Sequence, residues 1–280
     1  MKFLLLIFTP LLVNYVNLYL KKNSFLLNYS GDRHQKFTLE KKIPLSGGIF
    51  ILIFFLLFFN NQSLVFNIFA ILIFLLGFYS DLKILNSAKG RFIFQIIILY
   101  FFIYLIDLKL ENTKVILIDQ IIRNEIINYI FVLFCILILI NGTNFIDGLN
   151  TNALGYYIVL SIVLLHVASF NSFNFEFNNW IYWIIILFIL YLFNLYQKLF
   201  IGDNGAYLLG FIYGYLLINI YINNQGISPF FIVLLVWYPC FETLFSIFRK
   251  FRFNKSPILP DTKHLHQVVY ISVKKSFKLS

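Results

Sequence analysis

The sequence predicts an all-α polytopic membrane protein with about nine transmembrane helices, and three observations support this fold class. The chain of 280 residues is 60% hydrophobic and 12% charged, whereas soluble domains are about 45–50% apolar and about 25% charged. Long apolar runs recur along the whole chain, as a protein that crosses the bilayer many times requires. Lys and Arg are concentrated in alternate loops. We therefore expect a single transmembrane domain over residues 1–280, ending in a flexible basic tail at about 249–280.

The expected spans follow one another without a second soluble domain. They cover roughly residues 3–20, 46–60, 64–79, 92–106, 126–140, 153–170, 180–197, 206–222 and 228–248. Several are shorter than the ~20 residues that a helix needs to cross ~30 Å of hydrocarbon, so adjoining loop residues must complete them. Residues 1–20 show no small-x-small cleavage site, and we expect them to be retained as the first span. Cys135 and Cys240 lie in apolar runs and indicate neither a disulfide nor a zinc site.

The distribution of basic residues predicts the orientation of the chain. Nine spans place residues 21–44, 80–91, 141–152, 198–205 and 249–280 on one side of the membrane. This side carries 18 of the 22 Lys and Arg residues, and the other side carries four. By the positive-inside rule the basic side is cytoplasmic, which puts the N-terminus outside and the C-terminus inside. The net charge of +10 then reflects membrane orientation, and no nucleic-acid partner is expected.

Three carboxylates mark the expected cytoplasmic face. Asp81, Asp147 and Asp203 stand at the cytoplasmic ends of the third, fifth and eighth spans. Converging carboxylates repel one another unless a cation joins them, and their hard oxygen atoms suit Mg²⁺, with Mn²⁺ as the alternative. A buried carboxylate also suits an ion-coupled transporter. Such a site would lie near mid-span, so the placement of these three residues favours an enzyme at the membrane surface.

Basic residues and histidines on the same face suggest phosphate chemistry. Lys89 and Arg91 can supply positive charge for phosphate groups. His264 and His266 can add hydrogen-bond donors to a phosphate or a nucleotide. Taken together, these clusters predict metal-assisted phosphoryl transfer from cytoplasmic loops, between one lipid substrate and one soluble substrate.

At this point the chain resembles the polyprenyl-phosphate N-acetylhexosamine-1-phosphate transferases, the MraY/WecA-like membrane proteins of the glycosyltransferase 4 type. The resemblance covers about residues 31–267, and its motifs occur in the order of the family. They are Gln35-Lys36-Phe37, Ile43-Pro44-Leu45-Ser46-Gly47-Gly48, Gly77-Phe78-Tyr79-Ser80-Asp81-Leu82-Lys83, Lys89-Gly90-Arg91 with Gln95, Asn144-Phe145-Ile146-Asp147-Gly148-Leu149, Ile201-Gly202-Asp203-Asn204-Gly205 and His264-Leu265-His266.

The resemblance implies a reaction, a location and partners. The family transfers a sugar 1-phosphate from a UDP-sugar, typically a UDP-N-acetyl sugar, to undecaprenyl phosphate, with Mg²⁺ as cofactor and UMP as product. The expected location is the bacterial inner membrane, with the active site facing the cytoplasm. The expected role is to initiate a cell-surface glycan such as O-antigen or capsule. A homodimer is compatible with the sequence.

Site residues follow from the same resemblance. Asp203 would be the principal metal ligand, and Asp147 would shape the metal and nucleotide site, with Asn144 beside it. Asp81 would lie near the attacking lipid phosphate. The other substrate-binding candidates are Lys36, Lys89, Arg91, Asn204, His264 and His266.

Departures from the family pattern leave alternative functions open. Ser80 and Asn150 stand where the family commonly has Asp, Thr38 stands where a His is common, and the tail is short. These differences motivate a divergent, non-catalytic member as an alternative. A phospho-N-acetylmuramoyl-pentapeptide transferase of peptidoglycan synthesis is another, although His264-Leu265-His266 is not the consecutive-His pattern of that branch. Glu242 matches no motif and is the main residue in favour of a transporter.

Overall fold

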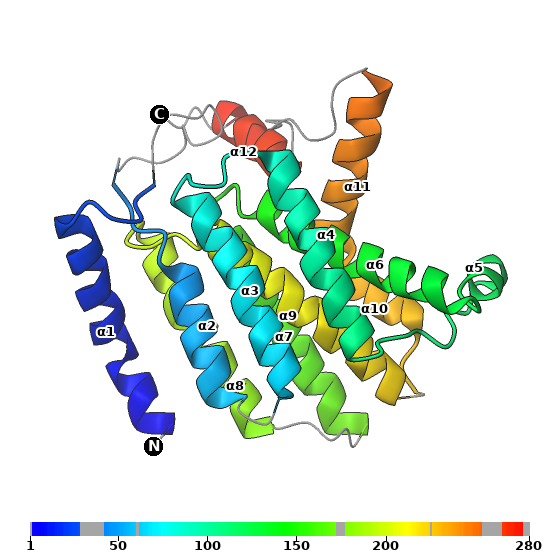
Figure 1. Cartoon of the computed structure of the whole chain (residues 1–280). Helices are drawn as coiled ribbons and strands as arrows, with labels where there is room; N and C mark the ends of the chain where they lie inside the picture. Colours follow the sequence, from blue (N-terminus) through cyan, green and yellow to red (C-terminus); the bar gives the residue numbers. More distant parts are fainter. Residues whose placement is uncertain are drawn as a thin grey trace.

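The computed structural model describes residues 2–28, 42–59, 62–171, 177–224, 226–253 and 265–276. Over these ranges the chain is helical with no strand, and one isolated β-bridge joins Leu27 to Pro44. Figure 1 shows a bundle of roughly aligned helices, with the start of α1 at one end and α12 at the other. The predicted all-α fold class is confirmed.

The helices occur in the following order. They are α1 (Lys2–Lys22), α2 (Gly47–Phe58), α3 (Leu64–Asp81), α4 (Ala88–Leu105), α5 (Ile116–Ile121), α6 (Glu125–Ile146), α7 (Asn152–Asn171), α8 (Phe177–Leu195), α9 (Gly202–Asn223), α10 (Pro229–Leu235), α11 (Trp237–Arg252) and α12 (Leu265–Ser276).

Side-chain caps explain where several of these helices begin. The hydroxyl oxygen of Ser63 accepts from the backbone N–H of Phe66 at the start of α3, and Ser87 does the same for Gly90 in α4. Asn124 accepts from the second and third N–H groups of α6. These contacts satisfy N–H groups that have no partner within the helix. The caps therefore fix the entry of the chain into each apolar segment.

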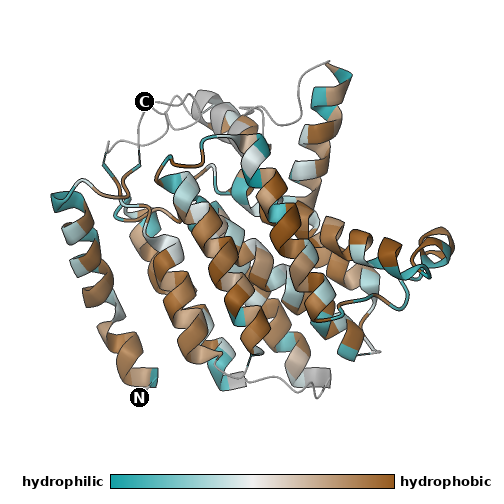
Figure 2. Ribbon diagram, in the orientation of Figure 1, coloured by the Kyte–Doolittle hydropathy of each residue, from teal (hydrophilic) through white to brown (hydrophobic). Residues whose placement is uncertain are grey.

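Seven helices are long and apolar enough to cross a membrane, namely α1, α3, α4, α6, α7, α8 and α9. Up to eight spans result if the bent pair α10 and α11 counts as one. The chain is therefore a multi-pass membrane protein. The expected second span, at residues 46–60, corresponds to α2, which has only 12 residues and would reach about 18 Å at 1.5 Å per residue. Figure 2 shows apolar residues along the helices and hydrophilic ones toward their ends.

The last expected span, residues 228–248, is broken rather than straight. Helices α10 and α11 meet at an angle of 75°. Pro239 has no N–H to donate to the carbonyl of Leu235, one turn earlier, and proline there disrupts the helix. The hydroxyl of Tyr156 donates to that carbonyl instead. The side chain from α7 thus satisfies the backbone group that the break exposes.

Helix α9 is the centre of the bundle. Of the residues in its apolar, membrane-spanning segment, 72% are buried inside the protein, whereas the corresponding shares are 28% in α1 and 22% in α4. It packs against α2, α3 and α6. Because those helices carry or adjoin the polar motifs, the position of α9 decides which of those motifs can meet.

Candidate active site

The carboxylate of Asp81, at the end of α3, caps the start of α9. Its Oδ1 accepts from the backbone N–H of Asp203 at 3.0 Å, and its Oδ2 accepts from the N–H of Asn204 at 3.0 Å. The side-chain amide of Asn204 also donates to Oδ2, at 2.6 Å. Negative charge at a helix N-terminus is favourable, because the unpaired N–H groups carry partial positive charge. Asp81 therefore joins two helices that are more than 100 residues apart in sequence.

Two glycines allow this close approach. Gly202 begins α9 with a φ of +73°, a conformation that glycine adopts readily. A Cβ atom at Gly202 would lie 2.6 Å from Oδ2 of Asp81, and one at Gly77 would lie 2.5 Å from Cα of Asn204. Any larger residue at either position would push α3 away from α9.

The carboxylate of Asp203 lies in a second cluster beside this cap. Its Oδ2 accepts from the hydroxyl of Ser80 at 2.5 Å and from Nη1 of Arg91 at 2.9 Å. Nη1 of Arg91 also donates to the oxygen of Ser80. A longer contact of 3.5 Å comes from the hydroxyl of Tyr207, one turn further along α9. The side chains of Arg91 and Asp203 are each about a quarter exposed, at 25% and 24%, so water screens their attraction only in part.

Asp147 completes the set of carboxylates at this end of the bundle. It follows the last residue of α6 and is half-buried. Burial raises the pKa of its carboxyl well above the usual range, and the charges of Asp203 and Asp81 raise that pKa further. The three carboxylates therefore repel one another, with Arg91 as the cation in contact with Asp203.

The sequence profile of glycosyl transferase family 4 matches residues 63–221, more than half of the chain. The chain belongs to glycosyl transferase family 4. An undecaprenyl-phosphate alpha-N-acetylglucosaminyl 1-phosphate transferase of Thermotoga maritima is 24% identical over 259 residues, which are 92% of this chain and 77% of the relative. A protein of the same name from Yersinia pestis is 27% identical over 148 residues, which are 50% of this chain and 40% of the relative.

Ser80 shows how this family 4 chain accommodates its departure from the expected acidic pair. An aspartate at position 80 would place a fourth negative charge next to Asp203. The hydroxyl of Ser80 instead donates to Asp203 and accepts from Arg91. Serine at this position thus replaces repulsion with a hydrogen bond to Asp203.

The remaining predicted site residues of the family 4 chain differ in their surroundings. Asn204 is fully buried, and its amide donates to the carbonyl of Leu45 as well as to Asp81. Lys89 is exposed in the first turn of α4, and Asn144 is half-buried in the last turn of α6. Lys36 and His264 lie outside the described residues. So does the side chain of His266, whose backbone belongs to α12.

The partners of three polar residues at this end, Tyr207, Gln95 and Glu242, could not be predicted from the sequence. Tyr207 stands four residues after Asp203, which is the spacing that puts two side chains on one helix face. Gln95 is buried and its carbonyl oxygen accepts from the amide of Asn141 at 2.9 Å, which ties α4 to α6. Glu242 accepts from the backbone N–H of Leu265 at 2.8 Å. The sequence signal for each was a polar residue within an otherwise apolar run.

The donor set can be compared with what Mg²⁺ requires. Within the described ranges, no group of three or more His, Cys, Asp or Glu side chains is arranged to hold a metal. Mg²⁺ needs only one or two carboxylates and takes water and substrate phosphate as its other ligands. The contacts of Asp203 described above all use Oδ2, whereas both oxygens of Asp81 accept from N–H groups of α9. Asp203 and Asp147 therefore fit such an ion better than Asp81.

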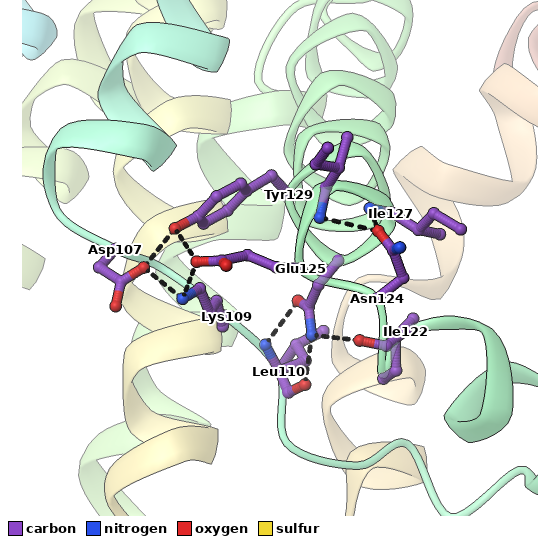
Figure 3. Close-up of polar contacts among 10 residues, drawn as sticks. Asp107, Lys109, Leu110, Ile122, Asn124, Glu125, Ile127 and Tyr129 are labelled. Carbon is purple, nitrogen blue, oxygen red and sulfur yellow. Dashed lines mark hydrogen bonds and ion pairs between the residues drawn. The ribbon is translucent and has the colours of Figure 1, made fainter.

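A different polar cluster occupies the opposite end of the bundle (Figure 3). Helix α4 connects the two ends, because Arg91 lies in its first turn and Asp107 follows its last residue by two positions. Nζ of Lys109 lies 2.8 Å from Asp107 and 2.5 Å from Glu125. The hydroxyl of Tyr129 donates to Asp107 and lies 3.2 Å from Glu125. Hydrogen bonds from Lys109 and Tyr129 lower the pKa of the Asp107 carboxyl.

Proposed function

We propose that the protein transfers a sugar 1-phosphate, N-acetylhexosamine 1-phosphate in the first instance, from a UDP-sugar to undecaprenyl phosphate and releases UMP. The observation that carries the proposal is the meeting of Asp81, Asp147, Asp203 and Arg91 at one end of a membrane-spanning bundle that belongs to glycosyl transferase family 4. The names of the two relatives support the lipid acceptor and the sugar. Initiation of O-antigen, capsule or a similar surface glycan is the cellular role we propose.

The charge balance of the site argues for a divalent cation. Among the described residues, three carboxylates gather around the single guanidinium of Arg91, so these groups by themselves would repel the diphosphate of a nucleotide sugar. We propose that Asp203 and Asp147 hold Mg²⁺, or Mn²⁺ in its place. When bound, the ion would neutralise phosphate charge and orient the phosphoryl group for in-line displacement.

The residues of the chain would position the substrates around that centre. Asp81 holds the first turn of α9 through two backbone hydrogen bonds, which fixes the direction in which Asp203 points. The planar guanidinium of Arg91 is oriented by Ser80 and Asp203, and its remaining N–H groups suit a phosphate. A phosphate monoester is already ionised near neutrality, so the acceptor lipid needs alignment more than a strong base.

We further propose that this end of the bundle faces the cytoplasm of a bacterial cell. The described basic residues favour it, since Lys21, Lys22, Lys83 and Lys89 lie in its loops and helix ends. Basic residues also close α11, at Arg249, Lys250 and Arg252. The opposite end carries Lys2, Lys109, Lys114 and Arg123.

Release of UMP is the decisive measurement. Purified protein should release UMP when it is incubated with undecaprenyl phosphate, Mg²⁺ and UDP-N-acetylglucosamine, and other UDP-N-acetyl sugars would rank as donors in the same assay. Omission of the lipid or chelation of the metal should stop the release. If a folded preparation releases no UMP with any donor, the proposed function is wrong and the non-catalytic alternative stands.

A further inference from the structure

Glu242 is a buried acid that the proposed chemistry does not use. It lies in the second turn of α11 and is 3% exposed. Its Oε1 accepts from the backbone N–H of Leu265 at 2.8 Å. Leu265 is the first residue of α12. A carboxylate therefore meets the N-terminus of the tail helix, where the helix dipole and the unpaired N–H groups favour negative charge.

Helix α11 is itself fixed to α6, the helix that precedes Asp147. The hydroxyl of Thr243, the residue after Glu242, donates to the carbonyl of Ile138 in α6 at 3.3 Å. One turn before Glu242, the hydroxyl of Tyr238 contacts the amide of Asn152 at 3.3 Å. The same amide donates to the carbonyl of Ile146 at 2.9 Å. The position of Glu242 is thus tied to the backbone next to Asp147.

These contacts form a continuous path from the carboxylate site to the tail. Figure 1 shows α12 at the end of the bundle where α3 ends and α4 begins, which is the end that holds Asp81 and Arg91. In the sequence, His264 and His266 flank Leu265. Anchoring the amide of Leu265 restricts where the first turn of α12 can lie, because consecutive Cα atoms are only about 3.8 Å apart.

We infer that Glu242 is a positioning residue that docks the tail helix on the membrane domain, and that it thereby sets the affinity for the nucleotide sugar. The inference about affinity rests on the proposed function; the docking itself does not. Glu242 touches no reacting atom in this scheme. It acts through Leu265, and its removal should raise KM for the UDP-sugar while kcat changes little.

Hydrogen exchange tests the docking without any assay of activity. In the full-length protein, Glu242→Ala should speed amide exchange across residues 265–276 by about tenfold to hundredfold, as expected for loss of a hydrogen bond to a charged group. Glu242→Gln keeps an oxygen acceptor and should retain most of the protection. Glu125→Ala, at the opposite end of the bundle, is the matched control and should leave exchange in the tail unchanged. Unchanged exchange in Glu242→Ala overturns the inference.

A second variant covers the case in which Glu242→Ala does not fold. Leu265→Pro removes the donated N–H and leaves Glu242 in place, and proline is well tolerated at the first position of a helix. It should expose α12 to exchange as Glu242→Ala does. Retention of full protection in a folded Leu265→Pro protein contradicts the docking contact.

Kinetics then test the link to substrate. Glu242→Ala and Leu265→Pro should each raise KM for the UDP-sugar about tenfold, with kcat within about threefold of the wild type, as loss of uniform binding predicts. Glu242→Gln should lie between them and the wild type. Faster tail exchange with an unchanged KM overturns the positioning role. If the wild type releases no UMP, the proposed function fails alone, and the exchange measurements still decide the docking.

Discussion

The two ends of α4 place acids and bases together in opposite ways. At its first turn, Arg91 contacts one carboxylate, that of Asp203, while Asp81 and Asp147 add two further negative charges. Just beyond its last turn, Lys109 contacts two carboxylates, those of Asp107 and Glu125. The side chains of Arg91 and Asp203 are about a quarter exposed, whereas those of Asp107 and Glu125 are 65% and 63% exposed.

The difference lies in what each end must hold. Exposed ion pairs are screened by water and contribute little to stability, so the cluster around Lys109 serves mainly to hold the connection between α4 and α6. The excess of carboxylates at the other end is partly shielded from water, and among the described residues the contact of Arg91 with Asp203 balances only part of it. Such an excess is costly for folding alone and becomes useful when a cation and phosphates are bound.

Replacing Asp203 should produce the largest effect. Asp203→Asn removes the charge that we propose for the metal and weakens the contact with Arg91, so kcat should fall by about 10²–10³-fold or more. UMP release at saturating substrates measures the loss. Glu125→Gln is the matched control and should retain full activity. A fully active Asp203→Asn protein would show that the two ends do not differ in function.

A charge-preserving substitution of Arg91 should have the second-largest effect on activity. Arg91→Lys keeps the positive charge but loses the planar guanidinium, whose Nη1 contacts both Ser80 and Asp203 and whose fixed fork of donors suits a phosphate. We expect kcat/KM to fall by about 10–100-fold, on the order of a few kcal/mol in the barrier. The comparison at the opposite end is Lys109→Arg, which should leave kcat/KM unchanged. Equal sensitivity of the two positions would contradict a functional difference between the two ends of α4.

Asp81 tests whether its carboxylate stabilises α9. Asp81→Ala removes a cap and leaves N–H groups at the start of α9 without their acceptor, which should cost about 1–3 kcal/mol in the free energy of unfolding. Asp81→Asn retains one acceptor oxygen and should cost less. Thermal unfolding of the purified variants in detergent provides the ranking. An unchanged Tm for Asp81→Ala would contradict the stabilising role of this cap. The predicted contact with the lipid phosphate would then be the remaining role of Asp81.

The smallest effect is expected at Asp107. Its pKa is lowered in the folded protein, so its contribution to stability is present above the unfolded carboxyl pKa, about 3.9, and is lost as the pH falls through the folded value. Asp107→Asn should therefore lower Tm only slightly, by the same amount across pH 6 to 8, a range of about two units well above either pKa, and should leave UMP release unchanged. This small difference in Tm between the wild type and the variant should disappear in acid. A marked loss at neutral pH would mean that this end contributes more than an exposed pair can.

Much of the fold could be predicted from the sequence because it depends on local composition. Each expected span coincides with a helix or with the bent pair α10 and α11, since long apolar segments must satisfy their backbone groups internally in lipid. The order of the motifs also led to the family that the sequence profile shows. The number of full spans was less predictable, because α2 is short and Pro239 breaks the final span.

The sequence by itself determined the membrane class, the family and the set of carboxylates that share one end of the bundle. Only the tertiary structure decided what each of them touches: Asp81 the N–H groups of α9, Asp203 the pair Ser80 and Arg91, and Glu242 the start of α12. The physical reason is the distance over which each kind of interaction acts. Apolar runs and loop charges act within a segment, whereas a hydrogen bond acts over about 3 Å and depends on how closely α3 and α9 pack at Gly77 and Gly202.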